Sequence, residues 1–154
     1  SDGTPDEWRE MLDVNVVSLC LCTKEAVRSM RERGVDDGQV IHISSMYAHV
    51  QQSRATAHFY LATKWAVRAL TEGLRQELRD LKSNIRIGSI SPGIVETEFS
   101  YRMNKDNPEL AKKLYSSLHA LQPQDVAASV VHVLSAPKHV QIHDILVRPT
   151  EQEG

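Results

Sequence analysis

Residues 58–79 read HFYLATKWAVRALTEGLRQELR, and the spacing of their hydrophobic side chains predicts a long helix over about 56–81. At about 100° per residue, one face of this helix collects Tyr60, Lys64, Val67, Thr71, Leu74 and Leu78. The opposite face collects the small residues Ala62, Ala66, Ala69 and Gly73. Because the first face carries the leucines, we expect it to point into the core and to carry Tyr60 and Lys64 inward.

The segments around this helix alternate between helix and strand patterns. A first helix is predicted from Thr4-Pro5-Asp6-Glu7, where a capping hydroxyl, a proline and an acid occupy favoured positions, to about Arg33, before Gly34. Short apolar runs at residues 39–45 and 85–90 predict strands, and Pro92-Gly93 stops the second. Residues 99–103 are expected to be irregular, and the remaining elements are helices over about 108–118 and 123–134 and a strand over 144–148. This order predicts one α/β domain over residues 1–154, with a parallel sheet.

The composition excludes several classes of protein. A net charge of -2 without a basic stripe argues against a nucleic-acid partner, and no apolar run is long enough to span a bilayer. Cys20 and Cys22 lie two residues apart within a predicted helix, so they cannot form a disulfide with each other. The seven histidines are scattered, and His139 and His143 lack a neighbouring acid or cysteine cluster, so we expect no metal site. The expected location is the cytoplasm.

Tyr60 and Lys64 lie four residues apart and are therefore neighbours on one helix face. An ammonium group favours a nearby phenolate and lowers the pKa of the phenol, which then exchanges a proton with a carbonyl or an alcohol. The alternative is a solvated helix face, with Lys64 extended to water.

Three further segments carry polar groups where a ligand could bind. Ser44-Ser45 ends the first strand and Ser91-Pro92-Gly93-Ile94-Val95-Glu96-Thr97 leaves the second, both on the side where parallel sheets bind ligands. Asn15 is the polar member of an otherwise apolar helical stripe: Trp8, Leu12, Asn15, Leu19, Cys22, Ala26 and Met30. Ordinary turns and a core amide satisfied by neighbouring backbone are the alternatives.

Taken together, Asn15, Ser45, Tyr60-x-x-x-Lys64 and Pro92-Gly93-Ile94-Val95-Glu96-Thr97 resemble the short-chain dehydrogenase/reductase family in order and spacing, over nearly the whole chain. The resemblance implies the last three strands of a Rossmann-type doubly wound parallel sheet. It also implies hydride transfer between a nicotinamide cofactor and a carbonyl or alcohol.

The resemblance assigns a role to each of these residues. Tyr60 would be the general acid/base and Lys64 would lower its pKa and hold the nicotinamide ribose. Ser45 would bind the substrate oxygen together with Tyr60, and Asn15 would hold a water in a proton relay from Lys64. The segment Val95, Glu96, Thr97 and Glu98 would contact the nicotinamide and pyrophosphate. Residues 99–119 would cover the substrate, with Phe99, Tyr101 and Met103 suited to an apolar ligand.

The chain departs from the family pattern in its first half. Its seven glycines form no Gly-x-Gly-x-x-Gly cluster, so the adenosine half of the cofactor site is missing and we expect a carboxyl-terminal fragment that is inactive alone. The parent protein is expected to use NADP, or NAD, to act on an apolar ketone or alcohol such as a steroid or isoprenoid. The alternative is an inactive fragment that serves as an interaction module.

The small stripe on residues 62–73 and the resemblance together predict a homo-oligomer formed through the two long helices. Small side chains allow another helix to approach closely on the face opposite Tyr60. The alternative is that this stripe packs only against the chain's own first helix.

Overall fold

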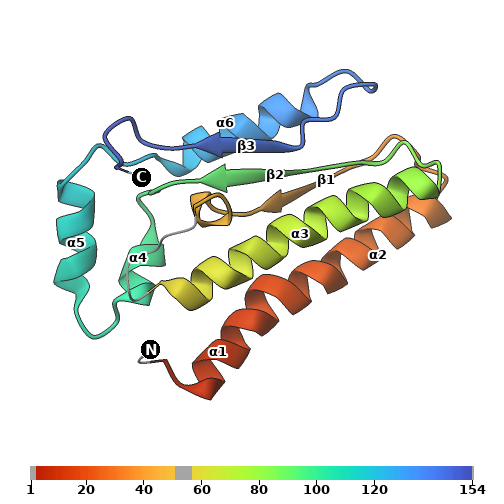
Figure 1. Cartoon of the computed structure of the whole chain (residues 1–154). Coiled ribbons are helices and arrows are strands. Elements are labelled where there is room, and N and C mark those ends of the chain that lie inside the picture. Colours follow the sequence, from red (N-terminus) through yellow and green to blue (C-terminus); the bar gives the residue numbers. More distant parts are fainter. Residues whose placement is uncertain (1–2, 51–56, 154) are drawn as a thin grey trace.

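A computed structural model describes residues 3–50 and 57–153. Its three strands, β1 (Gln39–Ile43), β2 (Arg86–Pro92) and β3 (Asp144–Val147), form a parallel sheet in the order β1-β2-β3. The predicted α/β class and parallel sheet are confirmed. Helices α2 (Ser18–Glu32) and α3 (His58–Asp80) lie on one face of the sheet, and α6 (Pro123–Leu134) lies on the other (Figure 1).

The middle strand, β2, is buried along its whole length. A strand covered on both faces needs apolar or small side chains, and its sequence RIGSISP supplies them apart from Arg86. The guanidinium of Arg86 donates to the carbonyls of Ala136 and Val140 at 3.1 and 3.0 Å. Gly88 is required here, because a Cβ atom would lie 2.3 Å from the carbonyl oxygen of Ile142. The strand continues through Pro92, beyond the predicted end, because Pro92 pairs with Val147.

The first long helix contains an unpredicted wide turn. It consists of α1 (Pro5–Leu12), a π-helical segment (Asp13–Val17) and α2, and begins at the capping box of Thr4 and Glu7. A π-helical turn inserts a residue and shifts every later side chain around the axis. The predicted stripe is therefore wrong after this turn, where Cys22 and Ala26 are exposed; Leu12, which precedes the turn, is exposed as well. The partly buried positions from α1 to α2 are instead Trp8, Met11, Asn15, Val16, Ser18, Leu19, Thr23, Val27 and Met30.

Helix α3 presents the predicted face to the sheet. Val67, Thr71 and Leu78 are buried, whereas Ala62, Ala69 and Gly73 on the opposite face are exposed. A core cluster forms where Leu78 meets Ile85 and Ile87, and it is extended by Val27, Met30, Val40 and Leu74. This packing fixes the rotation of α3 and therefore the direction of its first two turns.

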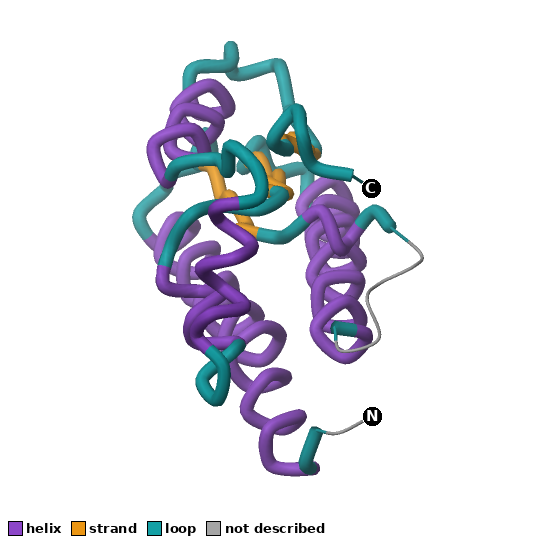
Figure 2. Tube along the Cα trace, turned by 90° about the vertical axis from the view of Figure 1, so that its left-hand side faces the viewer, coloured by secondary structure: helices purple, strands orange, loops and turns teal. Residues whose placement is uncertain are grey.

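Two short helices lie beyond the carboxyl ends of the strands, at the end that faces the viewer in Figure 2. They are α4 (Glu98–Met103) and α5 (Pro108–Ser116). The expectation that residues 99–103 are irregular is wrong, because Thr97 caps α4 by accepting a hydrogen bond from the Phe99 amide at 3.2 Å. No helix in residues 3–50 and 57–153 has the length and apolarity needed to cross a membrane.

His42 joins both long helices to the sheet from a buried position on β1. Its Nδ1 lies 2.8 Å from Thr71 Oγ1 and its Nε2 lies 2.9 Å from Thr23 Oγ1. Because Thr71 Oγ1 already donates to Val67 O at 2.8 Å, His42 Nδ1 must be the donor in the first contact. His42 Nε2 then accepts from Thr23, which requires a neutral ring. Burial lowers the pKa of His42 below its ordinary 6.5.

We predict that protonation of His42 destabilises the fold. Because its folded-state pKa is lowered, its contribution is complete above the ordinary value of 6.5 and is lost as the pH falls below it. The test compares the free energy of unfolding in denaturant, measured across acidic pH, between the protein and His42→Gln. The variant should lose roughly 1–3 kcal/mol at neutral pH because Thr23 loses its partner, and its stability should depend less steeply on acidic pH. Exposed His139→Gln is the control, and equal slopes in all three proteins would contradict the prediction.

Candidate active site

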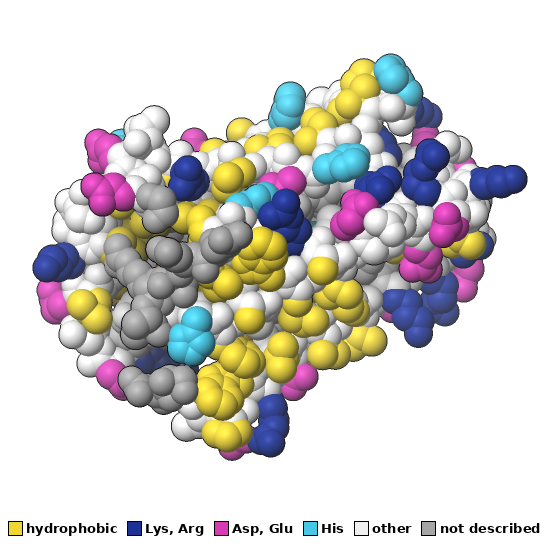
Figure 3. Space-filling view, in the orientation of Figure 1, with side chains coloured by type: hydrophobic (Ala, Val, Ile, Leu, Met, Phe, Trp, Pro, Cys, Tyr) yellow, Lys and Arg dark blue, Asp and Glu magenta, His cyan; other side chains and the backbone are white. Residues whose placement is uncertain are grey.

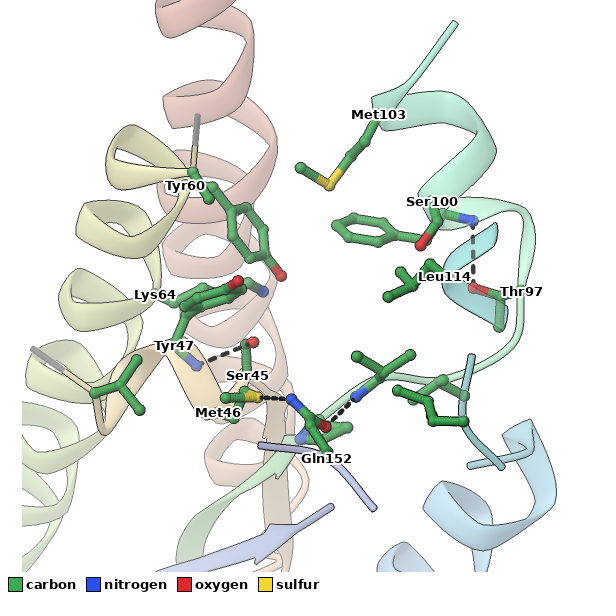
Figure 4. Close-up of a pocket in the computed structure, with 18 of the residues that line it drawn as sticks. Ser45, Met46, Tyr47, Tyr60, Lys64, Thr97, Ser100, Met103, Leu114 and Gln152 are labelled. Atoms are coloured by element: carbon green, nitrogen blue, oxygen red, sulfur yellow. Dashed lines mark hydrogen bonds between the residues drawn. The ribbon is translucent and has the colours of Figure 1, made fainter. Parts of the chain in front are cut away.

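A cavity of 760 Å³ lies at the carboxyl ends of β1 and β2, beside the first turns of α3 (Figure 4). Its walls come from the loop after β1, the turn after β2, helices α4 and α5, and the segment after β3. The structure brings five of the predicted site residues together here: Ser45, Tyr60, Lys64, Val95 and Thr97. This end of a parallel sheet is where α/β folds bind ligands.

Ser45 is held rigidly at the end of β1. It caps the 3-10 turn Met46–Ala48, where its Oγ accepts a hydrogen bond from the Tyr47 amide at 3.2 Å. Its side chain also hydrogen-bonds with that of Tyr60. The adjacent Ser44 also lines the cavity, and its buried Oγ has no hydrogen-bond partner among the described residues.

Tyr60 lies in the first turn of α3 between two other aromatic rings. Its centroid is 5.9 Å from that of Tyr47, in an edge-on arrangement, and 5.7 Å from that of Phe99. Burial raises the pKa of Tyr60 to about 12, although the hydrogen bond with Ser45 acts in the opposite direction. The phenol is therefore protonated at neutral pH.

Lys64 lies one turn further along α3, with Nζ 5.6 Å from the centroid of the Tyr60 ring. Nζ donates to the Ile43 carbonyl oxygen at 3.3 Å, so the side chain turns inward toward the end of β1 and not to solvent. Burial lowers the pKa of Lys64. The expectation that Lys64 lowers the pKa of Tyr60 is not met in this structure, because burial of the phenol dominates.

Asn15 lies outside the cavity lining, in the π-helical turn. Its Nδ2 donates to Thr63 Oγ1 at 3.1 Å, and Thr63 Oγ1 donates to the Tyr60 carbonyl oxygen at 2.7 Å. The wide turn thus connects the first helix to the backbone of Tyr60. π-helical turns inside α-helices are frequent at functional sites.

The predicted cofactor segment lies in the turn after β2, and only two of its four side chains line the cavity. Val95 forms a parallel bridge with Leu121, and both Val95 and Thr97 line the cavity. The side chains of Glu96 and Glu98 are exposed and lie outside the lining. Glu96 accepts from Gln122 at 3.0 Å, and Glu98 pairs with Arg102 at 2.8 Å. Ile94 also lines the cavity, so this part of the lining includes consecutive residues and leaves out only the two acidic side chains.

One side of the cavity is apolar. Phe99 and Met103 line it as expected, together with Leu114 and Leu118 from α5 and the loop that follows. Tyr101 does not line it, because it packs on Tyr115 with the ring centroids 5.9 Å apart.

Tyr47 and Gln152 are two of the cavity residues that were not among the sequence-predicted site residues. Tyr47 follows Ser45 by two positions, so an aromatic residue beside the serine motif was the available signal. Gln152 comes from the carboxyl-terminal segment, and no local pattern marks it.

Comparisons with known proteins agree with this geometry. The family model for short chain dehydrogenases matches residues 1–108. The chain is 55% identical to the cattle (Bos taurus) protein "Dehydrogenase/reductase SDR family member 11" over 97% of this chain and 59% of that protein. It is 38% identical to the farnesol dehydrogenase of Aedes aegypti over 94% of this chain and 55% of that enzyme. A solved serine dehydrogenase complexed with NADP+ superimposes with a TM-score of 0.90 at 31% identity, over 99% of this chain and 60% of that one.

The chain therefore belongs to the short-chain dehydrogenase family, and its sheet is part of a Rossmann-type fold. It spans 59% of the length of the cattle relative.

The buried phenol leads to a spectroscopic prediction. Alkaline titration of phenolate absorbance in the protein, minus that of Tyr60→Phe, should isolate one group with a midpoint near 12, well above the ordinary 10.0. Circular dichroism on the same samples verifies that the fold persists. A midpoint at or below 10.0 would show that burial does not dominate the pKa.

Proposed function

We propose that this chain is the catalytic, carboxyl-terminal part of an NAD(P)-dependent oxidoreductase that interconverts an apolar ketone and its alcohol. The observation that carries the proposal is the convergence of Ser45, Tyr60 and Lys64 on one cavity at the carboxyl end of the sheet. The alternative, an inactive interaction module, does not require three such groups in one place.

The proposed roles follow from the protonation states. Tyr60, protonated at neutral pH, donates its proton to a carbonyl oxygen as that oxygen gains negative charge. Ser45 orients the same oxygen through its hydroxyl. In the oxidative direction Tyr60 must instead accept a proton, and the ammonium of Lys64 stabilises the phenolate that precedes this step. Asn15 holds a water in the relay from Lys64, from the π-helical turn beside Tyr60.

The residues present fit the nicotinamide end of the cofactor. Lys64 and Ser44 both line the cavity, and the buried Ser44 Oγ has no hydrogen-bond partner among the described residues, so a polar ligand that reached it would complete its hydrogen bonding. The bound nicotinamide supplies or accepts the hydride. Val95, Thr97 and the backbone of Glu96 and Glu98 would contact this end, and Tyr60 and Lys64 would bind its ribose. The glycine-rich phosphate loop of the family has no counterpart in the sequence, so activity belongs to a protein of the relatives' full length.

The apolar wall supports an apolar substrate such as an isoprenoid or steroid. Phe99, Met103, Leu114 and Leu118 contribute no charge to it, and one relative is a farnesol dehydrogenase. NADP is the cofactor we propose, with NAD as the alternative, since solved relatives hold NADP+ and NADH.

Replacing Tyr60 by Phe in a protein of the relatives' length should reduce kcat by about 10²–10⁴-fold, because the ring remains and only the proton donor is lost. The measurement is NADPH oxidation with an apolar ketone. Tyr101→Phe removes a phenol outside the cavity and is the matched control. Near-normal kcat in Tyr60→Phe would refute the assignment.

We also propose that this protein forms a homo-oligomer through its long helices. The face of α3 that carries Ala62, Ala69 and Gly73 is exposed, and a Cβ atom built on Gly73 would have no neighbour within 4 Å among the described residues. The chain's own first helix therefore leaves this stripe uncovered at Gly73. Apolar side chains gather over the long helices on the face drawn in Figure 3, and Leu12, Val14, Val17 and Leu21 are exposed on the first helix.

Ala69→Arg tests the oligomer, because its large charged side chain would occupy the exposed small stripe without entering the core. We expect the full-length variant to sediment as a smaller species than the parent, with an unchanged circular dichroism spectrum. Ser116→Arg, on the exposed side of α5, introduces the same side chain elsewhere as a control. A parent protein that is already monomeric at micromolar concentration would exclude the interface.

A further inference from the structure

Gln152 joins the two loops that form the floor of the cavity. It follows β3 and lines the cavity between the serine loop and the turn after β2 (Figure 4). Its Oε1 accepts from the Ile94 amide at 2.9 Å, and its Nε2 approaches Met46 Sδ. One amide side chain thus contacts the residue after Ser45 and the turn that leads to Val95.

The turn after β2 is shaped to admit this side chain. A Cβ atom on Gly93 would lie 2.2 Å from Gln152 Oε1 and 3.0 Å from Arg148 Cγ. The absence of a side chain at Gly93 therefore leaves room for the Gln152 amide beside the Ile94 N–H. Gly93 itself donates to the Val147 carbonyl oxygen at 2.7 Å, so the turn is also attached to β3 just before this contact.

The neighbouring residue extends the same attachment. Glu151 Oε2 accepts from the His119 amide at 2.8 Å, at the end of the segment that follows α5. The segment after β3 therefore contacts the cavity wall at Ile94 and also holds His119, the residue after the lining residue Leu118.

We propose that Gln152 is a positioning residue of the active site. By holding the Gly93–Ile94 turn against the loop of Ser45 and Met46, its amide sets the separation of the two surfaces that enclose the nicotinamide and the substrate. This inference rests on the proposed function. Gln152 acts through its neighbours and does not take part in proton transfer.

Three variants distinguish the contributions of the Gln152 amide to the position of the turn. Gln152→Met keeps the length of the side chain but removes the acceptor for the Ile94 amide. Gln152→Glu keeps an acceptor oxygen and removes the Nε2 donor, so it should rescue part of the loss. Thr150→Ala changes an exposed residue of the same segment that lies outside the cavity lining, and is the control.

The first measurement is hydrogen exchange of the Ile94 amide in the protein. We expect Gln152→Met to increase its exchange about tenfold relative to the parent, since one hydrogen bond is lost, while the core strand β2 keeps its protection. The second measurement uses the full-length form, in which Gln152→Met should weaken NADPH binding and raise the KM of the ketone, each by about three- to tenfold. Because the proton donor is intact, kcat should fall less than in Tyr60→Phe.

A double variant tests the contact directly. Gly93→Ala should impair cofactor binding in the parent, where the new Cβ meets Gln152 Oε1, and should impair it less in a Gln152→Ala background. Independent effects of the two changes would overturn the proposal. So would unchanged KM and NADPH affinity in Gln152→Met, or exchange that increases equally across the whole sheet. If Tyr60→Phe keeps normal turnover, the proposed function has failed instead.

Discussion

The site depends on the packing of one face of α3 against the sheet. Leu78 at the far end of the helix enters the core with Ile85 and Ile87, and Val67 and Thr71 are buried along the way. Since a helix is rigid over this length, that packing also determines where Tyr60 and Lys64 point at the other end. Asn15 and Thr63 add a second constraint, because they connect the π-helical turn to the Tyr60 carbonyl.

Burial by this packing also sets the protonation states. Desolvation raises the pKa of Tyr60 and lowers that of Lys64, so each group is shifted toward its neutral form. A phenol with a pKa of about 12 is fully protonated at neutral pH but is a weak acid, so its proton moves only as charge develops on the substrate oxygen.

Strand β3 and the residues after it also hold the segments that border the cavity. Asp144 accepts from Ser91 at 2.9 Å and lies 3.2 Å from His49 Nε2, just beyond the serine loop. Beyond the other end of β3, Gln152 reaches the turn after β2. The last residues of the chain therefore contact both the segment after β1 and the turn after β2, through hydrogen bonds such as the one between Ile94 and Gln152, which are 58 residues apart in sequence.

The sequence by itself determined the alternation of helices and strands, the inward face of α3 and the grouping of Ser45, Tyr60 and Lys64, because periodicity and strand ends are local properties. Tertiary structure decided the rest. The wide turn at Asn15 moved Cys22 and Ala26 to the surface, since one inserted residue changes the helical phase of every later position without changing composition. Helix α4 formed where irregular chain was expected, because the Thr97 cap outweighs the weak pattern of six residues. The raised pKa of Tyr60 and the contact of Gln152 with Ile94 could not be foreseen, because desolvation and long-range contacts exist only once distant segments have packed together.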